Sequence, residues 1–374
     1  MIVSILACSG MVWSDEIVFV QNEKEHRLRG EILVTAEDES CLFRDVDSRL
    51  WLIKSDEIKS KTDVQEAVPP LTQKEVAANV LASLPADFRT ESTDHFVVAY
   101  NTERAYAKYI GGLYERLLRG FTNHWKSKRK WKLKEPAEPL VAIVFRNYEE
   151  YAAFVKNDIG IDPPATMVAY YNLMTNRVVM YDLTSQLVKP GQKLEDDRQI
   201  MEILANPNAI AMITTIIHEG THQLMFNLGM QQRLAATPIW VNEGLAMYFE
   251  PPDLSANSGW RAIGQINQLR LTTFRQALAA RPRASGQLEL MLTDDAVFRD
   301  QEQLLDRYAE AWGFNYFLLT KYSKEYVDYL KFLSEKPPLV EDSPETRLAD
   351  FRKFLAKDLA ELDREFIDFI RNLR

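Results

Sequence analysis

Apolar residues cover most faces of one helix-length stretch near the middle of the chain. Asn206 followed by Pro207 is a strong helix start, because asparagine caps the first turn and proline lacks only an N–H group that this turn leaves unpaired. Gly229 provides the matching stop signal. A helix that is apolar on most of its faces is typically buried in the core of a domain. Its apolar positions are Ala211, Met212, Ile213, Ile216, Ile217, Leu224, Met225 and Phe226.

Helix-like and strand-like patterns alternate on both sides of this stretch. A second amphipathic helix is expected over 238–250, where Pro251-Pro252 ends it. Residues 351–373 have the period of an amphipathic packing helix or a helix pair. Ahead of the core helix, the sequence predicts a helix (103–124), a strand (140–145), a helix (147–157) and a strand pair (165–172 and 177–182). We therefore expect an α+β domain over 91–374 that is mostly helical with a small mixed sheet.

Residues 15–60 have a different pattern of apolar and charged positions. Short strand-like runs, such as 17–20 and 50–53, are separated by charged turns. These runs predict a small all-β, barrel-like module ahead of the helical domain. Residues 61–90 are expected to form a charged linker that contains Pro69-Pro70 and one short helix.

Residues 1–14 resemble the apolar part of a secretion leader, with Ala7-Cys8-Ser9 as small residues near a cleavage point. No Lys or Arg precedes Lys24, so the positive start of such a leader is missing. We expect an exported protein, periplasmic or extracellular. A cytoplasmic protein in which this segment is a buried strand is the alternative. No other stretch approaches the roughly 20 apolar residues of a membrane span.

The composition is that of a folded chain with an excess of acidic residues. Hydrophobic residues make up 46% of the 374 positions, with 18 Phe, 15 Tyr and 7 Trp, which is enough for a large core. The net charge of −9 argues against nucleic acid as a partner. A basic run around Trp125 and Trp131 is the exception, and we interpret it as a solvated helix end and loop. Its cations are Lys126, Lys128, Arg129, Lys130, Lys132 and Lys134.

The predicted core helix carries the pentapeptide His218-Glu219-Gly220-Thr221-His222. On a helix the two histidines lie four residues apart, and therefore on one face and one turn apart. Both imidazoles can then reach one zinc ion, with Glu219 beside the metal as a general base. The alternative is a pair of core histidines at this spacing by chance. Burying His, Glu and His in an apolar helix is costly, however, unless they are paired or bind a metal.

Glu243, on the second predicted helix, is the candidate third ligand. An open catalytic zinc site needs three protein ligands and leaves the fourth position to water. Apolar residues flank Glu243 on both sides, which makes an unpaired carboxylate on that face costly. The alternative is an ordinary solvated helix glutamate. We expect one Zn²⁺ per chain, bound by His218, His222 and Glu243.

These motifs resemble those of the gluzincin metallopeptidases, the peptidase MA-like superfamily. The pentapeptide is followed by a string similar to that of the aminopeptidase N branch, Trp240-Val241-Asn242-Glu243-Gly244-Leu245-Ala246. The stretch from about residue 94 to 374 is closest to a bacterial gluzincin-like family of unassigned function. The resemblance implies zinc at the three proposed ligands, with Glu219 catalytic. The Gly-x-Met-Glu-Asn string with which the aminopeptidases bind a free amine is absent from this sequence, so we expect internal cleavage.

The sequence therefore predicts a zinc-dependent hydrolase that cleaves peptide bonds, an endopeptidase with Glu219 as general base and a peptide or protein as substrate. Two alternatives remain open. One is a non-catalytic zinc-binding scaffold or binding protein, and the other is a zinc hydrolase of a non-peptide amide such as a cell-wall bond. An intact Glu219 argues against the scaffold, because a structural zinc site needs no base.

Attack on a peptide carbonyl also calls for a hydrogen-bond donor to the oxyanion. Tyr308 opens a predicted helix and resembles, in its position, the catalytic tyrosine of the aminopeptidase N branch. The alternative is a core stripe, since Tyr308, Trp312 and Tyr316 recur every four residues. Tyr170 and Tyr171, on a predicted edge strand, are rival donors.

Overall fold

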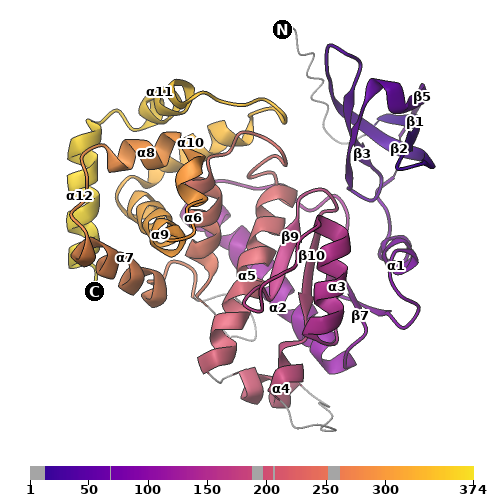
Figure 1. Cartoon of the computed structure of the whole chain (residues 1–374), viewed down its shortest axis with the longest axis horizontal. Coiled ribbons are helices and arrows are strands. Elements are labelled where there is room, and N and C mark those ends of the chain that lie inside the picture. The colour runs from indigo at the N-terminus through magenta and orange to yellow at the C-terminus, as the bar shows by residue number, and fades with distance from the viewer. Residues whose placement is uncertain (1–12, 68, 188–196, 205–206, 252–261) are drawn as a thin grey trace.

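The computed structural model describes residues 13–374 apart from 68, 188–196, 205–206 and 252–261. An all-β module comes first in the chain, and a mostly helical domain with its own small sheet follows (Figure 1). This is the α+β fold that the sequence predicts. The expected leader, residues 1–14, lies outside the described residues except for Trp13 and Ser14, which begin the first strand.

The N-terminal module is a five-stranded antiparallel sheet. Its strands are β1 (Trp13–Gln21), β2 (Lys24–Thr35), β3 (Cys41–Asp45), β4 (Leu50–Ile53) and β5 (Ile58–Ala67), in the order β4-β3-β2-β1-β5. Ile17, Phe19 and Phe43 are among the residues of a small core that is separate from the main one. The last strand continues beyond residue 60, where we expected the linker to begin, because β5 stays paired with β1 as far as Ala67 opposite Trp13.

The sheet of the helical domain is mixed. Its strands are β6 (Arg89–Ser92), β7 (Phe96–Tyr100), β8 (Leu140–Phe145), β9 (Ala169–Asn172) and β10 (Arg177–Tyr181), in the order β6-β7-β8-β10-β9. The three central strands run parallel and are buried along their whole length, as their unbroken apolar sequences require. Among the described residues, β9 pairs with β10 alone, in antiparallel register, and is shorter than the expected strand over 165–172. Within this part of the chain, one side of β9 is therefore an open sheet edge.

Helices α2 (Arg104–Asn123) and α5 (Pro207–Asn227) pack against each other and against this sheet, with α5 on β9 and β10. α5 is the apolar helix of the sequence, and Gly229 follows it with a φ of 74°, which glycine adopts without strain. The Gln223 side-chain amide of α5 donates to the carbonyl groups of Val141 and Asn176, both at 3.0 Å. These two bonds fix the position of α5 relative to β8 and β10.

The remaining helices complete the domain. They are α1 (Gln73–Ala82), α3 (Tyr148–Ile159), α4 (Asp197–Leu204), α6 (Ile239–Phe249), α7 (Gln268–Ala280), α8 (Gln287–Thr293), α9 (Leu304–Lys321), α10 (Ser323–Ser334), α11 (Pro344–Phe354) and α12 (Leu359–Asn372). Helices α7 to α12 lie on the side of the molecule away from the N-terminal module (Figure 1). The stretch 351–373, expected to be a packing helix or a helix pair, contains the end of α11 and all of α12. Among the described residues, no helix is both long and apolar enough to cross a membrane.

The basic run follows α2 as a short π-helical turn (His124–Lys128) and a loop. Trp125 is fully buried in the main core, and Trp131 packs edge-on against it. Arg129 turns inward and donates to the Leu319 carbonyl at 2.8 Å and to Ser323 Oγ at 2.7 Å. The aromatic rings of this run therefore serve packing, as the interpretation of a helix end and loop requires.

Helices α6 and α9 are in close contact at Gly244. A Cβ atom there would lie 2.0 Å from Asn315 Nδ2 and 2.6 Å from the Ala311 carbonyl oxygen. The Asn315 amide fills this space and donates to the carbonyl groups of Trp240 and Ala311, both at 2.8 Å. Gly244 therefore sets the spacing between the two helices.

We predict that Gly244→Ala lowers the free energy of unfolding by about 1–3 kcal/mol, the usual cost of overpacking a core. Gly112→Ala is the matched control, because Gly112 also lies in a helix but its Cβ would meet only the flexible Arg116 side chain, at 3.4 Å. Alanine is favoured over glycine within a helix by about 1 kcal/mol, so the control should be at least as stable as the parent. Urea unfolding of both variants measures the difference, and equal stabilities would contradict the prediction.

Candidate metal centre

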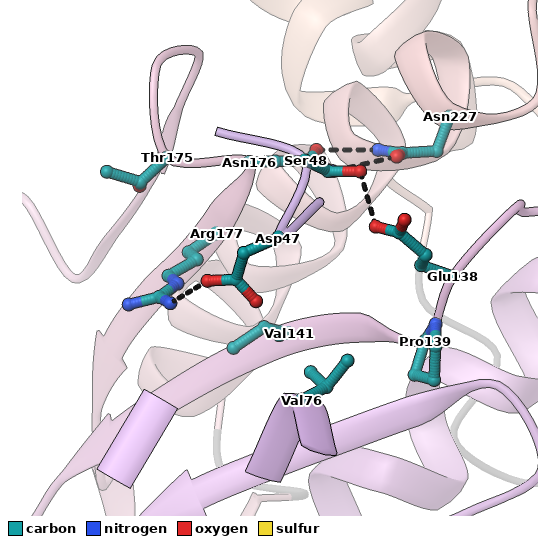
Figure 2. A pocket seen from close by; sticks show the side chains of 10 residues that line it. All are labelled: Asp47, Ser48, Val76, Glu138, Pro139, Val141, Thr175, Asn176, Arg177 and Asn227. Carbon is teal, nitrogen blue, oxygen red and sulfur yellow. Dashed lines mark hydrogen bonds and ion pairs between the residues drawn. The ribbon is translucent and has the colours of Figure 1, made fainter. Parts of the chain in front are cut away.

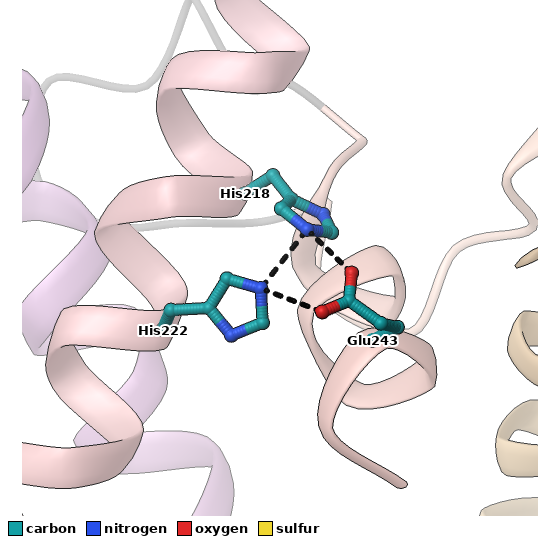
Figure 3. A group of neighbouring side chains, drawn as sticks. All are labelled: His218, His222 and Glu243. Carbon is teal, nitrogen blue, oxygen red and sulfur yellow. Dashed lines mark hydrogen bonds and ion pairs between the residues drawn. The ribbon is translucent and has the colours of Figure 1, made fainter. Parts of the chain in front are cut away.

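Three side chains from α5 and α6 converge on one point (Figure 3). His218 Nε2 lies 3.0 Å from His222 Nε2 and 3.2 Å from Glu243 Oε2, and Glu243 Oε1 lies 3.5 Å from His222 Nε2. A tetrahedral zinc ion with bonds of about 2.0–2.1 Å separates its ligand atoms by roughly 3.3 Å. The three side chains therefore fit around one ion of this size without rearrangement.

The chemistry of the donor set also fits zinc. Two imidazole nitrogens and one carboxylate oxygen are the ligands of an open catalytic zinc site of the His-His-Glu type. The two Nε2 atoms face each other at 3.0 Å, so without an ion one of them must carry a proton for the other to accept. A cation between them would use both lone pairs at once. The residues present are thus suited to hold the ion that the sequence implies.

The cluster favours positive charge. Burial alone would lower the pKa of His218, but its contacts with Glu243 and Glu250 outweigh burial and raise that pKa to about 10. Burial would raise the pKa of Glu243, but His222 and His218 hold it well below its usual range. Without a metal ion, a proton on His218 supplies the positive charge between the carboxylates. A metal ion that binds at Nε2 must displace this proton.

Glu250 contacts the second ring nitrogen of His218. Its Oε1 lies 3.0 Å from His218 Nδ1, and Asn267 and Arg270 donate to the same carboxylate at 2.7 Å and 2.8 Å. A carboxylate in this position fixes the tautomer and the ring direction of a metal-binding histidine. Glu250 was not predicted from the sequence, although a signal was present. It follows Glu243 by seven residues and caps the C-terminus of α6, so helical spacing places both carboxylates on one side.

Glu219 contacts the edge strand. The Tyr171 backbone N–H donates to Glu219 Oε2 at 2.8 Å. Burial raises the pKa of Glu219, while His218 and His222 oppose that shift. A carboxylate with a raised pKa is better matched to taking up a proton near neutral pH. No sequence motif marks a backbone N–H, so only the fold reveals this contact.

Gly220, inside the pentapeptide, allows α2 to approach α5. A Cβ atom at Gly220 would lie 2.6 Å from the Tyr114 ring. The Tyr114 hydroxyl donates to the Ile216 carbonyl at 3.1 Å, two residues before the first histidine. Tyr114 therefore packs behind the pentapeptide, and its own pKa is raised by burial and by the nearby Glu219 carboxylate.

The three candidate oxyanion donors differ in what their hydroxyl groups contact. Tyr170 donates to Asp158 at 2.6 Å, and the Tyr171 hydroxyl lies 2.7 Å from Asn176 Oδ1. Within the described residues, the Tyr308 hydroxyl has no hydrogen-bond partner. Burial raises the pKa of Tyr308, and the charges of the Glu243 and Glu219 carboxylates raise it further, while its ring stacks on Phe298. Trp312, next in the stripe, is fully buried.

The comparison with protein families covers the same part of the chain. The model of a family described as "Protein of unknown function (DUF1570)" matches residues 212–340. This segment includes the three converging residues, Glu219 and Tyr308. No curated protein matches the chain. The matched segment thus contains the candidate site, and the description of the family gives no activity for it.

We predict that Glu250→Gln weakens zinc binding about 10- to 100-fold, the usual effect of removing the partner of a metal-binding histidine. The amide cannot balance the Arg270 cation, which would then oppose positive charge at the cluster. Glu115→Gln is the matched control, because Glu115 is a buried glutamate 3.0 Å from a histidine, His95, away from the cluster. Competition against a chromophoric chelator measures both affinities. Equal affinities in the two variants would rule out the role of Glu250.

Proposed function

We propose that this protein is a zinc-dependent peptidase of the gluzincin type that cleaves peptide bonds inside a chain. The observation that carries the proposal is the position of Glu219 beside the convergent His218, His222 and Glu243 side chains. A site that held an ion only for stability would need the three ligands but not the fourth, acidic group. The raised pKa of Glu219 suits a base that takes and returns a proton.

When bound at this cluster, zinc would polarise the substrate carbonyl and lower the pKa of the attacking water. Glu219 would take the proton from that water and deliver it to the leaving amine. The hydrogen bond from the Tyr171 N–H fixes one oxygen of this carboxylate, and the other oxygen accepts no hydrogen bond from the described residues. Tyr308 would donate to the oxyanion, since its hydroxyl is the one candidate donor not already engaged among the described residues.

The open edge of β9 supports a peptide as substrate. Tyr171 faces Val178, and Ala169 faces Met180. The Tyr171 N–H donates to Glu219 and not to β10, so the pair Tyr171–Val178 is a non-hydrogen-bonded pair of the ladder. Such pairs alternate along the strand, so the pair Ala169–Met180 is of the same kind. The main-chain groups of Ala169 therefore also point to the open side of β9. An extended peptide can pair with such an edge as an added strand. This binding uses internal main-chain groups and needs no free terminus.

We predict that protein purified with zinc contains about one ion per chain. Glu219→Gln should keep the ion and lose turnover of an N-terminally blocked peptide library, whereas His222→Ala should lose both. Glu149→Gln, a change of the same kind at an exposed position, should keep both. Metal analysis and mass spectrometry of the digests provide the readouts.

The outcomes separate the alternatives. A zinc-free protein would contradict the metal site itself, and stepwise trimming from the N-terminus would contradict internal cleavage. Zinc without cleavage of any peptide would favour the scaffold, unless cell-wall fragments are cleaved. That last result would favour a hydrolase of non-peptide amides.

We predict that Tyr308→Phe reduces kcat about a hundredfold or more, the usual loss when one oxyanion donor is removed. Zinc content and thermal stability should change little, because only a hydroxyl without a partner among the described residues is lost. Tyr316→Phe is the control on the same helix, since its hydroxyl donates to the Gly264 carbonyl at 3.3 Å. Normal turnover in Tyr308→Phe would exclude it as the donor, and unfolding would favour a packing role.

A further inference from the structure

A separate cavity lies where the N-terminal module meets the helical domain. Its volume is about 190 Å³, whereas a single water needs only on the order of 10–15 Å³ of such space. An adjoining cavity of about 10 Å³ shares Thr175 and Arg177 with it and is drawn in Figure 2. The smaller space fits a water molecule, and the larger one has room for a small organic molecule.

Two arginines from different parts of the chain line the larger cavity. Arg177, at the start of β10, is only 5% exposed and donates to Asp47 at 2.8 Å and to Ser83 Oγ at 3.1 Å. Asp47 approaches the Arg177 guanidinium from one side (Figure 2). Arg49, from the module, has a buried Nε that bonds to no described residue, and it lies 3.6 Å from Asp47.

One carboxylate, Asp47, is thus shared by two arginines. Burial lowers the pKa of Arg177, and the neighbouring Arg49 cation lowers it further. The 3.6 Å from Arg49 Nε to Asp47 allows an ion pair but is too long for a hydrogen bond, and a buried donor without a hydrogen bond is costly. Two neighbouring guanidinium groups are a good partner for a planar carboxylate, which accepts two hydrogen bonds at once. This wall of the cavity therefore favours a bound carboxylate.

Asp158 of α3 also lines the cavity. Its Oδ2 accepts hydrogen bonds from the Tyr170 hydroxyl and the Asn172 amide, at 2.6 Å and 2.7 Å, and its Oδ1 accepts none from the described residues. This carboxylate can bind an ammonium group and would repel a dianion. Ile143, Phe154 and Val179 form an apolar floor, and the other lining residues are the polar Ser83, Asn157 and Thr175.

We propose that this cavity binds a free α-amino acid with a small apolar side chain. Arg49 and Arg177 would hold its carboxylate, Asp158 its ammonium group, and the apolar floor its side chain. Because Arg49 belongs to the module and Arg177 to β10, the ligand would also tie the module to the sheet. The proposal is independent of the metal cluster and of peptidase activity.

Calorimetric titration of the full chain with L-valine tests the proposal. L-Valinamide lacks the carboxylate and 3-methylbutanoate lacks the ammonium group, so each should bind about tenfold or more weakly than L-valine, a loss of one charged hydrogen-bonding group. Inorganic phosphate should not displace L-valine. No binding of L-valine at tens of millimolar, equal binding of the three compounds, or displacement by phosphate would overturn the proposal.

Variants locate the binding in this cavity. Arg49→Gln and Asp158→Asn should each weaken L-valine binding about tenfold or more, while zinc content stays unchanged. Arg27→Gln is the control, because Arg27 is an exposed arginine of the same module that pairs with Glu16 at 2.8 Å. Circular dichroism checks that both variants fold. If Arg49→Gln disturbs the module, Asp158→Asn still tests the cavity, because Asp158 belongs to α3. Unchanged affinity in both cavity variants would overturn the proposal.

Discussion

His218 is held at both ring nitrogens by two glutamates, one within α6 and one that caps its C-terminus, and the rest of the candidate site depends on this contact. Glu243 Oε2 lies 3.2 Å from Nε2, and Glu250 Oε1 lies 3.0 Å from Nδ1. Burying such charges between apolar helices is costly unless each finds a partner. Arg270 and Asn267 complete the pairing of Glu250. The charges that define the chemistry of the cluster therefore also fix α5 against α6.

Small residues give the surrounding helices the spacing that this contact needs. Gly220 admits the Tyr114 ring behind α5, and Gly244 admits the Asn315 amide behind α6. Each glycine follows a glutamate of the candidate site directly, Gly220 after Glu219 and Gly244 after Glu243. The close packing at each glycine therefore also sets the direction of the neighbouring carboxylate. Gly244 also brings α9 near α6, and α9 carries Tyr308. Glycine in a helix lowers its intrinsic stability, which indicates that packing around the cluster decides these two positions.

Local patterns predicted the elements well, while pairings distant in the sequence had to come from the fold. The apolar helix ending at Gly229 and the strand over 140–145 follow from periodicity and stop signals. The length of β5 depends on its pairing with β1, which no local pattern encodes. Helical spacing was sufficient to place His218 and His222 together, whereas Glu250 was not predicted, and the bond from the Tyr171 N–H to Glu219 depends on where β9 lies. The choice among the three tyrosines likewise required knowing what each hydroxyl contacts.

The N-terminal module and Glu219 are linked through one short hairpin. Of the strands in the described part of the chain, only β10 pairs with β9, and the turn between the two gains support from elsewhere. The Leu50 N–H of the module donates to the Met174 carbonyl at 2.7 Å, and Arg233 donates to the carbonyl groups of Ser48 and Leu173 at 2.7 Å and 2.9 Å. The strand that precedes this turn, β9, carries the Tyr171 N–H that fixes Glu219. The acceptors of all three bonds are backbone carbonyl groups, and two of the donors belong to the Arg233 side chain. The ion pair between Asp47 of the module and Arg177 at the start of β10 supports the same hairpin. The module therefore holds the edge strand, and with it the N–H that fixes Glu219, through both backbone and side-chain groups.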